Sequence, residues 1–144
     1  MARPFNMDSE SNTILVVDDT PITARWVGYV VGRLGFNAVL AFNGEEALNS
    51  LAQQQFVAVI CDVEMPGMNG FELLQSIREF YPALPVILMS ASCNDERRRA
   101  ASACGAQAFL EKPLNADQLT RLFGGTPEAQ PVPELRAPVL SVLH

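Results

Sequence analysis

Residues 13–19 read Thr-Ile-Leu-Val-Val-Asp-Asp, an unbroken apolar run that ends in two acidic side chains. A run without polar alternation suits a strand that is covered on both faces, which is typical of a parallel sheet. Thr20-Pro21 follows directly and is typical of a helix start, with Thr20 as the N-cap and proline at the first helical position. Gly35 stands where this helix is predicted to end. The stretch therefore predicts a buried strand followed by a helix.

The same alternation of a short apolar run and a longer segment of helical periodicity occurs five times. The predicted strands are Thr13–Val17, Asn37–Ala41, Phe56–Cys61, Val86–Met89 and Ala108–Leu110. The later helices are predicted at Glu45–Gln54 after an Asn43 cap, from about Gly70 to Phe80, from an Asn94 cap to near Gly105, and from an Asn115/Gln118 capping box to Gly124-Gly125. Five strand–helix units joined by short loops predict an α/β fold with a doubly wound parallel sheet and right-handed crossovers.

Composition and length predict one domain. The chain has 144 residues, 49% of them hydrophobic and 18% charged, which is enough apolar material for a continuous core. The domain is expected at residues 12–124, after a loose polar leader at residues 1–11. Residues 125–144 hold four prolines and no helical or strand period, so they are interpreted as a Pro-rich tail or linker.

Several function classes are disfavoured by charge and by residue types. The net charge of −6 argues against nucleic acid as a partner, and the basic run Arg97-Arg98-Arg99 is interpreted as a solvated helix face. Three cysteines without paired spacing and a single histidine argue against a disulfide framework and against a zinc site. No stretch resembles a signal peptide or is long enough to cross a bilayer, so a cytoplasmic location is expected.

Polar residues stand at the ends of four of the predicted strands. Asp18 and Asp19 follow the first strand, Asp62 the third, Ser90 the fourth and Lys112 the fifth. The carboxyl ends of parallel strands meet at one edge of a sheet, where open α/β sheets bind their ligands. The sequence therefore predicts that these five side chains form one site.

The residue types at this edge indicate phosphoryl chemistry. Three crowded carboxylates repel one another, and a hard divalent cation with oxygen ligands, such as Mg²⁺, would remove that conflict. Lys112 would then supply a positive charge to one phosphoryl oxygen and Ser90 a hydrogen bond to another. Asp62 stands alone before a loop rich in glycine and proline, and aspartate is a known nucleophile in phosphoryl transfer. Asp62 is therefore the expected acceptor.

Each of these residues also has a purely structural interpretation. Paired aspartates after a strand often mark only the start of a helix. Ser90 could cap a turn, and Lys112 could be a surface charge before Pro113. The position of all of them at equivalent strand ends favours a common site.

The residues around these positions resemble the receiver domains of two-component signalling, over roughly Asn12 to Phe123. The similar stretches are Ile14–Asp19, Asp62–Gly70, Val86–Ala91 and Phe109–Pro113. The resemblance implies a flavodoxin-like, three-layer fold with five helices and five parallel strands in the order 2-1-3-4-5.

The resemblance also implies roles for the acidic residues. Asp62 would accept phosphate from a histidine kinase or a small phosphodonor. Asp19, Asp62 and the backbone carbonyl of Glu64 would bind Mg²⁺, with Asp18 acting through a water. The Glu64 side chain is expected beside the acyl phosphate, where it would influence hydrolysis.

The remaining roles concern the switch. Lys112 would hold the phosphoryl group, and its bond to Pro113 is expected to be cis. Ser90 and the following Ala91 would bind the phosphoryl group, with Ser90 moving toward it on activation. Phe109 matches the switch aromatic, which turns inward as Ser90 moves, and ordinary core packing of Phe109 is compatible with that role.

The implied function is a binding module that phosphorylation switches through the face made by the fourth helix, the fifth strand and the fifth helix. Its partners would be a sensor histidine kinase or a histidine phosphotransfer protein and a downstream protein, with a dimer as one option and without nucleic acid or membrane. Such a chain catalyses only its own phosphoryl uptake and loss. The alternatives are a phosphorelay carrier or phosphate sink without its own output and, less favoured, a Mg²⁺-dependent phosphohydrolase. A dinucleotide-binding role is disfavoured because no G-x-G-x-x-G follows the first strand.

Overall fold

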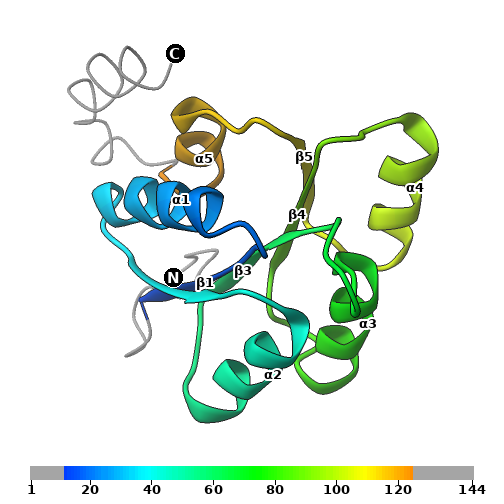
Figure 1. Ribbon diagram of the computed structural model, residues 1–144, viewed down its shortest axis with the longest axis horizontal. Coiled ribbons are helices and arrows are strands. Elements are labelled where there is room, and N and C mark those ends of the chain that lie inside the picture. Colours follow the sequence, from blue (N-terminus) through cyan, green and yellow to red (C-terminus); the bar gives the residue numbers. More distant parts are fainter. Residues whose placement is uncertain (1–11, 125–144) are drawn as a thin grey trace.

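The computed structural model describes residues 12–124, in which five strands and five helices alternate (Figure 1). The strands are β1 (Thr13–Val17), β2 (Asn37–Ala41), β3 (Ala58–Asp62), β4 (Val86–Ser90) and β5 (Ala108–Glu111). The helices are α1 (Pro21–Arg33), α2 (Gly44–Gln53), α3 (Gly70–Phe80), α4 (Asp95–Ala103) and α5 (Ala116–Phe123). All strand pairs are parallel and their order is β2-β1-β3-β4-β5, which confirms the predicted fold. The predicted leader and Pro-rich tail lie outside the described residues.

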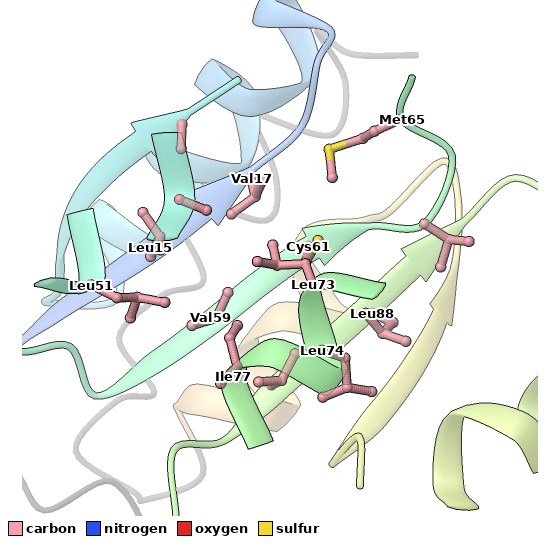
Figure 2. Close-up of a cluster of buried hydrophobic side chains, with 14 of the residues drawn as sticks. Leu15, Val17, Leu51, Val59, Cys61, Met65, Leu73, Leu74, Ile77 and Leu88 are labelled. Carbon is pink, nitrogen blue, oxygen red and sulfur yellow. The ribbon is translucent and has the colours of Figure 1, made fainter. Parts of the chain in front are cut away.

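The sheet is the middle of three layers, because its strands are apolar on both faces and helices cover both. Successive side chains of a strand point to opposite faces. Leu15 and Val17 therefore pack in one core cluster with residues of α2, α3 and α4, while Ile14 and Val16 pack in the other with α1 and α5. Figure 1 shows α1 and α5 on one side of the sheet and the other three helices on the opposite side. Figure 2 shows the first cluster, where Leu73 of α3 lies over the sheet.

Three strands end one residue later than the apolar pattern predicts, and β3 also begins two residues later than predicted. β3 runs from Ala58 to Asp62 instead of Phe56–Cys61, β4 includes Ser90, and β5 includes Glu111. The parallel ladder continues through these polar positions, with Asp62 opposite Met89 and Ser90 opposite Glu111. The strand ends at the predicted site therefore belong to the hydrogen-bonded sheet.

Asparagine side chains start four of the five helices. The predicted caps at Asn43, Asn94 and Asn115 are confirmed, and Asn115 forms the predicted capping box with Gln118. A second capping box, Asn69 with Glu72, was not predicted although its N-x-x-E spacing is present in the sequence. The predicted end of α3 at Phe80 is confirmed, while the predicted ends of α2, α4 and α5 are one or two residues too long, as expected for the least certain part of a helix prediction.

Thr20 is the N-cap residue of α1, as predicted, but its side chain does not cap the helix. The Thr20 hydroxyl makes no capping hydrogen bond, and the Thr20 N–H donates instead to Oδ1 of Asp18 at 2.9 Å. Pro21 does occupy the first turn, as predicted. Asp18, three residues before the first helical residue, thus accepts from the N–H of the N-cap residue.

The basic run on α4 is exposed in part, as the sequence suggested, but two of its arginines also contact aromatic rings. The Arg97 guanidinium lies 5.8 Å from the centre of the Phe71 ring, and that of Arg98 lies 5.7 Å from the centre of the Phe109 ring. Arg98 also donates to the backbone carbonyl of Phe109 at 3.0 Å. Arg98 and Arg99 are nevertheless exposed, so the original interpretation holds for the exposure of these two residues. Because Ala101 is the one buried residue of α4, the contacts of Arg97 and Arg98 add to the attachment of this helix.

The three cysteines Cys61, Cys93 and Cys104 are free thiols. None of the helices within residues 12–124 is long and apolar enough to cross a membrane.

Candidate functional site

The structure brings the carboxylates of Asp18, Asp19 and Asp62 together at one edge of the sheet. One carboxylate oxygen from each residue lies within 4.8 Å of the others. Asp18 and Asp62 are buried, with 0% and 2% of their surface exposed, while Asp19 is exposed. β1 and β3 are neighbours in the sheet, so their carboxyl ends place these residues side by side. An all-oxygen donor set of this size suits a hard divalent cation.

Lys112 connects two of these carboxylates. Its Nζ lies 3.2 Å from Oδ2 of Asp18 and 3.4 Å from Oδ1 of Asp62, and its side chain is 20% exposed. The alternative that Lys112 is a free surface charge is therefore wrong. The Lys112–Pro113 peptide bond is cis. The site thus combines three acidic side chains with one ammonium group.

The charges of the site shift the pKa values of its members. Burial, and then the negative charge of Asp18, raise the pKa of Asp62 from 3.8 to about 6, although Lys112 opposes the shift. Burial alone would lower the pKa of Lys112, but the attraction of Asp18 and Asp62 outweighs it, and the pKa of Lys112 is raised. Ionised Asp62 is therefore held at a free-energy cost, and the ammonium group of Lys112 is stabilised.

This cost predicts a pH dependence of stability in metal-free buffer. Between about pH 4 and pH 6 the folded chain holds the Asp62 proton more tightly than the unfolded chain, so the free energy of unfolding falls as pH rises. The cost is absent below about pH 4 and complete above about pH 6, where it reaches up to about 3 kcal/mol. Urea unfolding of the wild type and of Asp62→Asn at several pH values measures it. An identical pH profile in the two proteins would contradict this assignment.

The loop between β3 and α3 passes very close to Asp62. A Cβ atom on Gly70 would lie 2.5 Å from the backbone oxygen of Asp62 and 2.7 Å from Cα of Val63. The Gly70 N–H donates to the carbonyl of Val63 at 3.0 Å, and the Glu64 N–H contacts Oδ1 of Asp62 at 3.4 Å. The close approach of Gly70 was not predicted, because a glycine that starts a helix does not by itself indicate what it faces.

Ser90 is fully buried and its hydroxyl does two things. It donates to Oε2 of Glu64 at 2.5 Å, and it accepts from the Ser92 N–H at 3.0 Å. Oε1 of Glu64 accepts from the N–H of Ala91 at 3.2 Å. The structural alternative, in which Ser90 caps a turn, is therefore correct for the structure as it stands.

Phe109 is buried, with 8% exposure, and its ring centre lies 6.4 Å from that of Phe71. Ordinary core packing thus applies to it.

Arg97 is a member of this region that the sequence did not indicate: its Nη2 lies 2.8 Å from Oε2 of Glu64. The two residues are 33 positions apart, and no periodicity relates them.

Residues 14–123 match the family model of the response regulator receiver domain. The protein belongs to this family.

Similar receiver domains occur in proteins of two kinds. The chain is 37% identical over 110 residues to sensor histidine kinase RcsC of Escherichia coli (strain K12), which is 76% of this chain and 12% of RcsC. It is 35% identical over 113 residues to transcriptional regulatory protein ZraR of Klebsiella oxytoca, which is 78% of this chain and 26% of ZraR. The receiver domain therefore spans a minor part of these relatives.

Solved structures show the same fold. Chemotaxis protein CheY4 of Vibrio cholerae matches with a TM-score of 0.73 and 29% identity, over 80% of this chain and 98% of CheY4. The receiver domain of NtrX from Brucella abortus matches with a TM-score of 0.72 and 32% identity, over 76% of this chain and 92% of that domain. This chain is thus a receiver domain of two-component systems in both sequence and fold.

Proposed function

We propose that this receiver domain is the phosphoacceptor of a two-component phosphorelay, and that Asp62 takes up the phosphoryl group with the help of Mg²⁺. The observation that carries the proposal is the bridge of Lys112 between Asp18 and Asp62, with Asp19 in the same cluster. A lone ion pair would need one carboxylate, whereas this edge concentrates three carboxylates around one cation. Such a surplus of negative charge suits a site that receives a further cation.

The chemistry assigned to Asp62 is nucleophilic substitution at phosphorus. One carboxylate oxygen of Asp62 forms a bond to phosphorus, the bond from phosphorus to the donor breaks, and the donor leaves with the electron pair. The ammonium group of Lys112 stabilises the charge on the phosphoryl oxygens. The side-chain contacts of Asp62 with Lys112 and with the Glu64 N–H both involve Oδ1. The second oxygen therefore has no hydrogen-bond partner among residues 12–124 and is the suitable nucleophile.

The cation would be held by Asp19, Asp62 and the backbone carbonyl of Glu64, with Asp18 acting through a water. When bound, it supplies positive charge to the carboxylates and to the phosphoryl oxygens. The chain's own residues orient the acceptor and exclude bulk water from buried Asp18 and Asp62.

Mg²⁺ is expected to stabilise the folded chain. At a Mg²⁺ concentration about 100 times its Kd, the free energy of unfolding should rise by about 2.7 kcal/mol. Urea unfolding with and without MgCl₂ measures the rise, and NaCl at equal ionic strength controls for screening. Asp19→Asn should lose most of the effect. Equal stabilisation by both salts would remove the metal site.

The proposed output is a change in protein binding at the face of α4, β5 and α5, with a sensor histidine kinase or a histidine phosphotransfer protein as the phosphodonor. The chain acts on itself and on no external substrate. Receiver domains similar to this one occur in a sensor histidine kinase as well as in transcriptional regulators, so a relay carrier or phosphate sink is the second candidate.

Acetyl phosphate tests the proposal. Incubation with Mg²⁺ is expected to add one phosphoryl group per chain in the intact mass spectrum, and a chelator should prevent it. Hydroxylamine should remove the group, because it cleaves acyl phosphates. Steady turnover of added phosphoesters without an adduct would favour the phosphohydrolase instead.

A further inference from the structure

Glu64 is an exposed residue that nevertheless holds three partners from distant parts of the chain. Its carboxylate accepts from the Ser90 hydroxyl at 2.5 Å, the Ala91 N–H at 3.2 Å and Arg97 Nη2 at 2.8 Å. Arg97 Nη2 also lies 3.4 Å from the Ser90 hydroxyl. A glutamate that is 44% exposed at its side chain has no need of such partners for its own solvation. The contacts therefore position Glu64 for a reason other than burial.

The donors that Glu64 occupies stand next to the proposed acceptor. Asp62 pairs with Met89 across the ladder between β3 and β4, and Ser90 and Ala91 are the next two residues. A phosphoryl group and a carboxylate are both anions that accept from hydroxyl and backbone N–H donors. A phosphoryl group on Asp62 would therefore require the donors that Glu64 already holds.

We infer that the Glu64 carboxylate is a built-in competitor of the phosphoryl group for the Ser90 hydroxyl and the Ala91 N–H. The inference rests on the proposed function, and it adds the regulation of the same site. Phosphoryl uptake displaces Glu64 from both donors, so part of the binding energy of the phosphoryl group is used to expel the carboxylate.

The displacement has a direct route to α4. Arg97 is held on one side by Glu64 and on the other by the ring of Phe71. The Phe71 ring contacts Phe109, which lies under Arg98 of the same helix. When Glu64 leaves, Arg97 loses its ion pair and α4 loses one of its few anchors. The competitor thereby couples the occupancy of the site to the attachment of α4.

The length of the side chain at position 64 distinguishes competition for the donors from simple repulsion between two anions. Glu64→Asp keeps the negative charge but shortens the side chain by one methylene, which puts Ser90 and Ala91 beyond hydrogen-bond distance. Competition predicts that Glu64→Asp and Glu64→Ala bind a phosphoryl analogue about equally well and about tenfold more tightly than the wild type. Repulsion predicts that Glu64→Asp behaves like the wild type.

The experiment is a titration of the whole chain with beryllofluoride in saturating Mg²⁺, followed by the backbone amide resonances of Ala91 and Ser92. Glu96→Gln on exposed α4 removes a charge without touching these contacts, and its Kd should stay within about twofold of the wild type. In a Ser90→Ala background, the gain from Glu64→Asp should shrink, since one contested donor is gone.

Beryllofluoride binding distinguishes the phosphoacceptor function from the competition by Glu64. If the wild type does not bind beryllofluoride at all, the proposed phosphoacceptor function is wrong. If it binds, but with the same Kd in the wild type and in Glu64→Asp, the competitor is wrong and the phosphoacceptor function stands.

Discussion

Replacing Asp62 with asparagine is expected to abolish the phosphoryl adduct that acetyl phosphate forms in Mg²⁺. The amide has the shape of the carboxylate but is not a nucleophile, so the bond to phosphorus cannot form. The fold should persist, because the substitution removes a buried charge whose pKa is raised by burial and by Asp18. In metal-free buffer at neutral pH the variant should therefore be at least as stable as the wild type.

Intact mass spectrometry measures the adduct, and peptide mapping assigns it. Glu79→Gln is the matched control, because Glu79 is an exposed carboxylate near the carboxyl end of α3, away from the site edge. It should be labelled to the same extent as the wild type. A wild-type level of adduct on folded Asp62→Asn would mean that another residue, which the peptide map would identify, is the acceptor, and the assignment of Asp62 would have to be abandoned.

Gly70→Ala is expected to destabilise the chain strongly and to impair labelling at the same time. The new Cβ would meet the backbone of Asp62 at 2.5 Å and of Val63 at 2.7 Å, and backbone atoms cannot rotate away as a flexible side chain can. Relief requires movement of the β3–α3 loop that follows Asp62. Overpacking of this kind costs about 3 kcal/mol of unfolding free energy.

Gly32→Ala provides the opposite expectation with the same chemical change. Gly32 lies within α1, and a Cβ there meets no atom within 4 Å among those described. Alanine should stabilise the helix by about 0.5–1 kcal/mol. Urea unfolding compares the two variants. A Gly70→Ala protein as stable as Gly32→Ala would show that the loop adapts, and that Gly70 does not position Asp62.

The fold could be predicted from the sequence because the apolar runs, its strongest pattern, also form the buried core that stabilises it. Runs such as Ile14–Val17 have no polar position, as expected for a strand buried on both faces, and both faces are indeed covered. The ends of the strands could be predicted less well. Apolar patterning stops at Asp62 and Ser90, whereas the backbone ladder continues through them.

The candidate site divides in the same way. Asp18, Asp19, Asp62 and Lys112 could be grouped from the sequence because parallel strands bring their carboxyl ends to one edge. The pair of Glu64 and Arg97 could not, because it joins a loop to a helix and depends on how far α4 lies from the sheet. The capping box of Asn69 and Glu72 could have been predicted, since its spacing is visible in the sequence.

The thin attachment of α4, with Ala101 as its one buried residue, has a consequence for how such proteins diversify. A helix that contributes little to the common interior can accumulate exchanges on its outer surface with small penalties for folding. Duplicated genes could therefore acquire different recognition specificities at α4 while the charged edge and the interior layers are inherited unchanged. Positions of α4 other than Arg97, Arg98 and Ala101 would then change almost independently of the sheet.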